Sequence, residues 1–381
     1  MIYADHAATT RLRDCALQAM MPFLTDCYAN ASGAYPFGQA AKKALEDARR
    51  QIADCIHAAP SGIIFTSGGS ESDNQAIRSA AEIGARSDKK HIISAAFEHH
   101  AVLRTLDALR ADGWEITLLD VGERGIVSAE QVAAAIRPDT ALVSVMFANN
   151  EIGTIQPAAE IGAVCRQRGV LFHTDAVQAA GHLPIDTEEM QIDLLSASAH
   201  KFGGPKGAGF LYARRGISLT PLIYGGAQER NRRAGTENIP AIVGMAAALA
   251  EACAEMESES AAVRRQRDAI IAALSEIPGS MLNGDAEMRL PSNISFCFAG
   301  IESETLLLLL GERGICASVG SACASGAAEP SHVLRAIGRS DALARGALRL
   351  TIGAELTDSD RQTLIAAVRE NVERLRAISH R

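Results

Sequence analysis

The chain alternates short apolar runs with longer amphipathic stretches. Residues 37–58 place Leu45, Ala48, Ile52 and Cys55 at helical spacing, which predicts a helix with one buried face. Further apolar runs of strand length lie at 63–65, 91–95, 115–119, 140–147, 169–173, 193–198 and 209–212, with helical runs between them at 71–85, 101–111 and 158–168. Non-alternating apolar strands are typical of a parallel sheet that is buried on both faces. Alternation of strands with helices therefore predicts βαβ units and an α/β fold.

The pattern changes after about Ile239. A long helical stretch covers 241–274, followed by a strand at 293–298, a helix at 302–312, a strand at 348–352 and a final amphipathic helix at 357–378. This order indicates a second, smaller α+β domain, whose boundary can lie anywhere along the long helix.

Composition narrows the classes of protein. Of the 381 residues, 48% are hydrophobic and 22% charged, as in a soluble globular chain. The net charge of −8 argues against a general nucleic-acid or membrane-surface binder, which needs a dominant basic patch. The eight cysteines form no CxxC pair, so they make a poor metal or disulfide framework and are expected to be reduced thiols. Neither a secretory signal nor a membrane span is expected, and we expect a soluble cytoplasmic protein.

Two strand ends carry polar motifs, and ligands of α/β folds bind beyond the carboxyl ends of the strands. The sequence TSGGSES at 66–72 lies between a strand and a helix, where free backbone N–H groups suit a phosphate. An ordinary turn with a serine N-cap is the alternative. Asp175 closes another apolar strand, where its carboxylate could hold a positively charged ring nitrogen or simply cap a helix.

A lysine and a cysteine complete the candidate chemistry. Lys201 follows the strand 193–198 and precedes a Gly/Pro-rich turn, where a lysine of lowered pKa can form a Schiff base; Lys206, beyond the turn, is the rival. Cys323 lies in the small-residue loop ASVGSACASG, which indicates an exposed thiol. A phosphate loop, an acid for a ring nitrogen, a lysine and a thiol together favour pyridoxal phosphate chemistry, in which the cofactor is the electron sink.

Motifs along the chain give a family resemblance. They are DHAATT, TSGGSESDN, EHHAVL, NNEIG, HTDAVQ, SAHKFGGPKG, RAGTEN, GSACASG and EPSHVLRAIG. On these motifs the chain resembles the cysteine desulfurases of the NifS/IscS type, in the class V aminotransferase family of fold type I. It departs from the usual pattern mildly, for example at Ser70 (usually Thr), Ala199 (often Gly) and Ala234 (often Ser).

The resemblance implies an architecture. It predicts a large domain at residues 15–250, with a mainly parallel seven-stranded sheet between helices. It also predicts a smaller α+β domain, formed by residues 1–14 and 251–381, that carries the mobile loop with Cys323.

The resemblance also implies roles for individual residues. Lys201 would hold pyridoxal phosphate covalently and later move the Cα proton, while Cys323 would accept the sulfur. Around the cofactor, His99 would stack on the ring and, as a catalytic residue, relay protons, Asp175 would pair with the ring nitrogen, and Gln178 would bond the ring hydroxyl. The phosphate ligands would be Gly69, Ser70, Ser198 and His200, with Thr236 reaching the phosphate of the neighbouring subunit. Asn150 and Arg349 would hold the substrate carboxylate, Asn150 would also contact the cofactor, and no metal is expected.

The implied reaction is removal of sulfur from L-cysteine, giving L-alanine and a persulfide on Cys323. The implied partners are a second copy of the chain, in a homodimer, and a sulfur acceptor. That acceptor is either an iron–sulfur scaffold protein or a sulfurtransferase for tRNA thiolation or thiamine synthesis. Two alternatives stay open: a selenocysteine lyase or other class V enzyme, and an inactive interaction protein that only docks on sulfur-transfer partners.

Overall fold

The computed structural model describes residues 1–319 and 330–379, so the predicted site residue Cys323 lies outside the described residues. A seven-stranded sheet forms the centre of the larger part, in the order β2-β8-β7-β6-β5-β3-β4. Its strands are β2 (Ile63–Thr66), β3 (His91–Ala95), β4 (Glu115–Leu119), β5 (Thr140–Ser144), β6 (Leu171–Asp175), β7 (Leu194–Ser198) and β8 (Gly209–Ala213). Only β8 runs antiparallel to its neighbours, β2 and β7. The predicted α/β class and mainly parallel sheet are confirmed.

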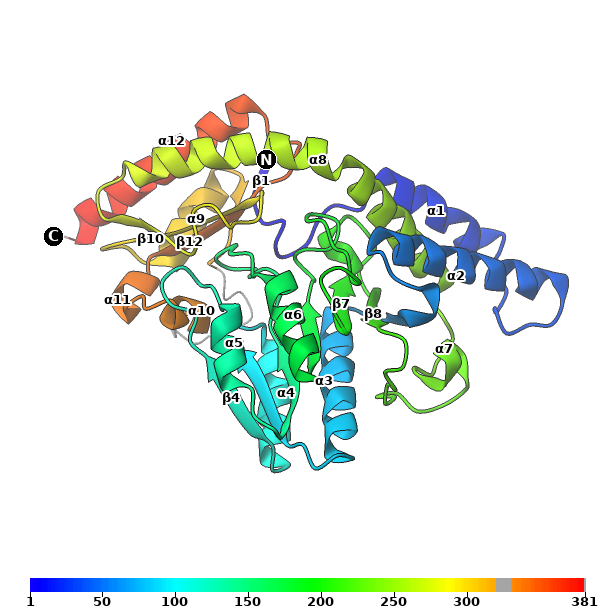
Figure 1. Cartoon of the computed structure of the whole chain (residues 1–381). Helices are drawn as coiled ribbons and strands as arrows, with labels where there is room; N and C mark the ends of the chain where they lie inside the picture. Colours follow the sequence, from blue (N-terminus) through cyan, green and yellow to red (C-terminus); the bar gives the residue numbers. More distant parts are fainter. Residues whose placement is uncertain (320–329, 380–381) are drawn as a thin grey trace.

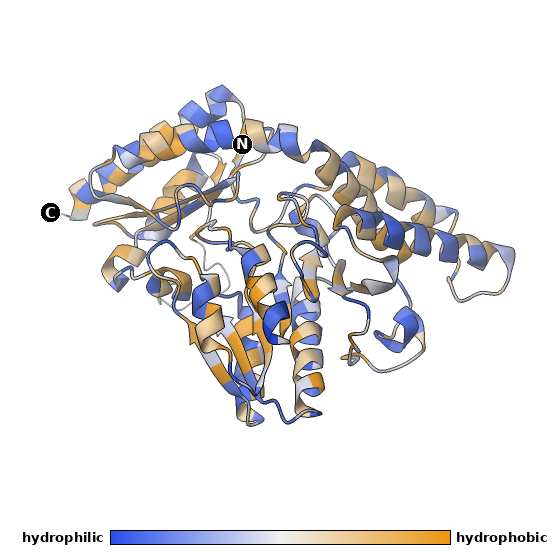
Figure 2. Cartoon of the chain, viewed as in Figure 1, coloured by the Kyte–Doolittle hydropathy of each residue, from blue (hydrophilic) through white to orange (hydrophobic). Residues whose placement is uncertain are grey.

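Helices lie against this sheet and around its edges (Figure 1). Their bounds are α1 (Asp14–Thr25), α2 (Pro36–Cys55), α3 (Gly69–Ala85), α4 (His100–Ala111), α5 (Ala129–Ala135), α6 (Ala158–Arg168) and α7 (Gln228–Asn231). Many of them are striped in apolar and polar colours, as expected for helices with one buried face (Figure 2). All five residues of β3, β5, β7 and β8 are buried, which explains why these strands are mainly apolar without a regular alternation of apolar and polar residues.

A second core belongs to the smaller part of the molecule. Its three-stranded antiparallel sheet has the order β12-β10-β9, from β9 (Ser280–Leu282), β10 (Asn293–Phe298) and β12 (Ala347–Thr351). The N-terminal strand β1 (Ile2–Tyr3) pairs in parallel with β11 (Ile315–Cys316). The remaining helices are α9 (Ser303–Glu312), α10 (His332–Ala336), α11 (Asp341–Ala344) and α12 (Asp358–Ser379). The domain boundaries given above stay a prediction.

Helix α8 (Ile239–Ser275) joins the two parts. It runs from the α1–α2 pair to α12 and packs against all three helices (Figure 1). By length and composition alone α8 could cross a membrane, but half of its most apolar window is buried inside the fold. A helix that is apolar because neighbouring helices cover it passes the same test.

Candidate active site

The phosphate-type motif forms a tight turn between β2 and α3. Gly68 caps the 17-residue helix with φ of 153°, a region that only glycine occupies readily. A Cβ on Gly69 would lie 2.6 Å from Val177 Cγ2, and a Cβ on Gly68 would lie 3.5 Å from Ser198 Oγ. The turn therefore brings the buried Ser198 at the end of β7 beside the first N–H groups of α3, where the helix end favours an anion.

A buried acidic cluster lies between the ends of β3 and β6 and helix α3. Asp175 is 4% exposed, and its Oδ1 accepts a hydrogen bond of 2.9 Å from Val177 N. Single ligand atoms of Asp175, His99 and Asp73 all lie within 4.8 Å of one another. Burial raises the pKa of Asp175, while His99 and Lys201 oppose that rise. A cation placed against this carboxylate would therefore be stabilised.

His99 and not His100 belongs to this cluster. His99 is half-buried at the N-cap of α4, where its Nδ1 accepts a 3.1 Å hydrogen bond from Ala101 N, which leaves Nε2 to carry the ring proton. Burial lowers the pKa of His99, so its imidazole is neutral near pH 7. His100 is exposed, and its ring lies on that of His332 at 4.6 Å.

Lys201 lies at the end of a short 3₁₀ turn, Ala199–Lys201, directly after β7. Its Nζ donates to Ala7 O at 2.5 Å and to Ala8 O at 2.8 Å, and Gln178 Nε2 also donates to Ala7 O, at 3.1 Å. Lys201 is close enough to influence the pKa of both Asp175 and His99. The rival, Lys206, is exposed.

His200 points toward the N-terminal segment. Its Nδ1 lies 3.2 Å from Thr9 Oγ1, and burial together with Lys201 and Lys206 lowers its pKa to about 4. A neutral His200 can still donate one hydrogen bond to an anion, but it adds no positive charge.

Arg349 and Asn150 approach each other from the two parts of the molecule. Arg349 on β12 is 4% exposed; its Nη2 donates to Asp5 Oδ1 at 2.8 Å and its Nη1 to Asn150 O at 3.2 Å. Arg349 Nε is buried and has no hydrogen-bond partner among the described residues. Such an unused donor suits a carboxylate.

Thr236 is not part of this cluster. It is exposed on the segment between β8 and α8, whose hydrogen bonds include contacts with α2, β2 and α3.

Sequence reasoning missed Asp73, although it lies within the motif TSGGSESDN. It is 1% exposed, and its pKa is raised well above the usual range by burial and by Asp175. A charged residue on the buried face of a helix was the available signal.

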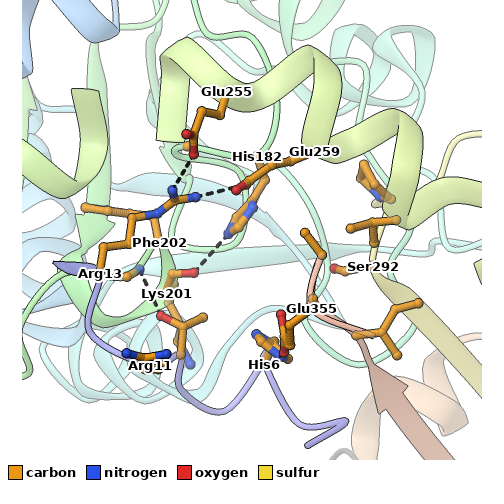
Figure 3. A pocket seen from close by; sticks show the side chains of 18 of the residues that line it. His6, Arg11, Arg13, His182, Lys201, Phe202, Glu255, Glu259, Ser292 and Glu355 are labelled. Atoms are coloured by element: carbon orange, nitrogen blue, oxygen red, sulfur yellow. Dashed lines mark hydrogen bonds and ion pairs between the residues drawn. The ribbon is translucent and has the colours of Figure 1, made fainter. Parts of the chain in front are cut away.

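A cavity of about 850 Å³ opens beside Lys201, between the N-terminal segment and α8 (Figure 3). Arg13 lies there between glutamates, with Glu255 at 2.7 Å and Glu259 at 2.9 Å. His182 Nε2 lies 2.9 Å from Lys201 O. The lining includes Gln178 but not Asp175, His99 or Arg349, so the cavity reaches the lysine from another side than the acidic cluster.

Comparisons with known proteins agree on one family. The sequence model described as Aminotransferase class-V matches residues 2–364. A curated relative, "Cysteine desulfurase IscS" of Methanosarcina thermophila, is 48% identical over 99% of this chain and 93% of its own length. Another of that name, from Clostridium botulinum, is 46% identical over 99% and 96%.

Solved structures give the same result. A structure titled "NIFS-LIKE PROTEIN" matches with a TM-score of 0.91 and 35% identity, over 98% of this chain and 99% of that one. A structure titled "SspA in complex with cysteine" matches with a TM-score of 0.82 and 37% identity, over 93% and 99%.

Proposed function

The chain belongs to the class V aminotransferase family, among its cysteine desulfurases of the NifS/IscS type, and we propose that it moves the sulfur of L-cysteine to Cys323 and releases L-alanine. The observation that carries this proposal is the buried Asp175 carboxylate beside His99 and Lys201, at the ends of β3, β6 and β7.

The residues present fit pyridoxal phosphate. The Asp175 carboxyl, whose pKa burial raises, would be stabilised by a protonated ring nitrogen. The turn at Gly69 and Ser70, with Ser198 beside it, would hold the phosphate with backbone and hydroxyl donors. His99 would lie on the ring and Gln178 would reach its hydroxyl. When bound through Lys201, the cofactor supplies an electron sink for the substrate Cα.

Each protein residue then has a stated task. Arg349 would hold the substrate carboxylate with its unused Nε, beside Asn150. Lys201 Nζ would take the proton from the substrate Cα and later return one. The Cys323 thiolate would attack the substrate sulfur, so that the Cβ–S bond breaks as an S–S bond forms. Of the two thiol protons, one ends on the persulfide and the other on the new methyl carbon of L-alanine.

A product assay tests this proposal. Purified protein with pyridoxal phosphate, L-cysteine and a reductant should release sulfide and L-alanine in equal amounts. Lys201→Ala should lose both the lysine-bound absorbance and the activity, whereas Cys323→Ala should keep the absorbance and lose sulfide release. Full activity in Cys323→Ala would refute the thiol's role. Cleavage of selenocysteine with hardly any of cysteine would favour a selenocysteine lyase, and a colourless protein would favour an inactive interaction protein.

We propose that the chain works as a homodimer. Leu17, Met21 and Leu24 are spaced to share one face of α1 and are 47–56% exposed, and Tyr28 and Tyr224 are 74% and 81% exposed. Figure 1 shows α1, α2 and α7 at the same end of the molecule. Large apolar side chains exposed together are typical of a covered interface. Sedimentation should give twice the chain mass, and Met21→Glu should shift the protein toward the monomer.

We propose a cytoplasmic location and a protein acceptor for the sulfur. Seven cysteines are free in the described part of the chain, which is typical of a reducing compartment. The acceptor would be an iron–sulfur scaffold protein or a sulfurtransferase for tRNA thiolation or thiamine synthesis. Loading Cys323 with radioactive sulfur and adding each purified acceptor in turn would identify the one that removes the sulfur fastest.

A further inference from the structure

The segment at 228–236, which we call the arm, has an unusual backbone. Glu229, Arg230 and Asn231 have φ of 45°, 58° and 63° in sequence. Three consecutive non-glycine residues in the left-handed region are unfavourable, because each Cβ approaches its own carbonyl group. Such a conformation persists only where the surroundings fix it.

A buried ion pair fixes the first part of the arm. The Glu229 carboxylate accepts hydrogen bonds of 2.7 and 2.8 Å from Arg49 and one of 3.0 Å from Phe65 N. Arg49 also donates to Ile63 O at 2.8 Å and lies over the Phe65 ring at 4.5 Å. Both partners are buried. Since Ile63 and Phe65 belong to β2, the arm is held by the strand that leads into the phosphate turn.

The second part of the arm is held by α3, the helix that starts at the same turn. Arg233 Nε donates to Glu71 Oε1 at 3.0 Å, and Glu71 also accepts Ser67 N at 2.8 Å. Gln75 Nε2 donates to Arg232 O at 2.7 Å. The arm then reaches the surface, where Thr236 is exposed.

We propose that Arg49 and Glu229 are positioning residues that hold Thr236 for the cofactor phosphate of the partner subunit. This inference rests on the proposed function, because it takes for granted the bound cofactor and the homodimer. A threonine hydroxyl on a fixed backbone donates to a phosphate oxygen at little cost in conformational entropy. Because the same β2 and α3 also form the phosphate turn of their own subunit, each chain carries its own turn and the hydroxyl it lends as one rigid unit.

Mixed dimers test the inference. One subunit carries Lys201→Ala together with an arm variant, and the other is wild type; different affinity tags on the two subunits isolate the mixed species. Only the wild-type subunit can then show lysine-bound absorbance. Excess inorganic phosphate is then added as a competitor for the phosphate site. The rate at which the wild-type subunit loses its lysine-bound absorbance measures release of the cofactor. Glu229→Gln in the other subunit should speed release at least fivefold, and Thr236→Ala should do the same.

Combining the two substitutions shows whether Glu229 acts through the position of Thr236 or through a general loss of stability. The double variant Glu229→Gln/Thr236→Ala should release no faster than Thr236→Ala alone, because both act through one hydroxyl. Asp193→Asn is the matched control: Asp193 is also buried and also accepts an arginine, Arg214, and a backbone N–H, Phe172 N. It should leave release from the partner unchanged.

A second measurement, on the protein without cofactor, reports directly on whether the arm is held in place. Trypsin should cut the apo dimer after the arm arginines faster in Glu229→Gln than in wild type or Asp193→Asn. If Glu229→Gln does not fold, Arg49→Lys replaces it, with a smaller effect in the same direction. An effect of Thr236→Ala without one of Glu229→Gln or Arg49→Lys would overturn the inference, as would no effect of Thr236→Ala. A wild-type protein that forms no lysine-bound absorbance would instead overturn the proposed function.

Discussion

Replacing Arg289 with methionine should destabilise the protein and weaken cysteine binding. Arg289 is 1% exposed and donates hydrogen bonds to oxygen atoms of four residues. They are Ile152 O at 2.8 Å, Asp285 O at 2.8 Å, Asn283 O, and Asn293 with its Oδ1 at 3.0 Å and its backbone O at 3.5 Å. Ile152 lies two residues after Asn150, so the guanidinium joins the candidate substrate segment to the smaller part of the molecule.

The size of the effect follows from two opposing contributions. Methionine would leave four buried acceptors without a donor, and a hydrogen bond to a charged group contributes about 1.5–3 kcal/mol, so the loss is at least about 6 kcal/mol. Burial, together with the nearby Arg267, lowers the pKa of Arg289 to about 10, so the buried charge makes an unfavourable contribution that an uncharged side chain removes. Because this gain offsets part of the lost hydrogen bonding, we expect a net loss in the free energy of unfolding of about 3 kcal/mol.

Chemical unfolding of the apo protein near neutral pH measures this loss, and KM for L-cysteine reports on the Asn150 segment. The control is Arg339→Met, since Arg339 is half-buried and makes two bonds of 3.0 Å, to Asn283 Oδ1 and Leu282 O. Arg339 makes fewer bonds than Arg289 and its side chain is only half-buried, so we expect a smaller loss, of about 1 kcal/mol. An Arg289→Met protein as stable as the control, with unchanged KM, would refute the reasoning.

Four further outcomes are expected. Gly209→Ala would place a Cβ 2.6 Å from Gly68 Cα, so cofactor affinity in an absorbance titration should fall at least tenfold; equal affinity would contradict the role of the turn. Gly311→Ala in α9 would add a Cβ that meets no neighbouring atom within 4 Å, so thermal unfolding should show a gain in stability of up to about 1 kcal/mol. Burial lowers the pKa of His173 from 6.5 to about 3. Because the unfolded chain then binds a proton that the folded chain refuses, His173 should lower stability as the pH falls from about 6.5 to 3, by up to about 1.4 kcal/mol per pH unit, and His173→Gln should lose this share of the slope. Arg349→Lys should raise KM for L-cysteine about tenfold with a smaller change in kcat, since lysine cannot bind a carboxylate bidentately.

The local pattern of apolar and polar residues was enough to predict most strands of the large sheet and several of the helices that cover it. The run at 91–95 is apolar because β3 is buried on both faces, and the helical run at 71–85 has the one-sided pattern of α3. The pattern missed α1, which is apolar on both its buried and its exposed faces and contains Pro22. The strand expected at 140–147 ends at Ser144, because its last residues leave the ladder and lead to Asn149.

Part of the candidate site could also be predicted from the sequence. Lys201 and His99 follow strands, Asp175 is the last residue of one, and parallel strands end at one edge of a sheet, so their meeting follows from the fold class. Asp73 escaped notice because its burial depends on how α3 packs on β6 and β7. The partners of Arg349 could not be predicted, because Asp5 and Asn150 are 344 and 199 residues away from it.

By itself the sequence determined the α/β class, the family and the residue types that pyridoxal phosphate chemistry requires, since these depend on local periodicity and on short motifs. The tertiary structure decided which of several residues of the same type lie together in the site. It left Lys206 and His100 exposed, buried Asp73 beside Asp175, and held an exposed Thr236 on a strained arm through Arg49 and Glu229. Burial and charge pairing arise only when distant segments pack, which is why the pKa values and the positioning contacts could not be predicted from the chain alone.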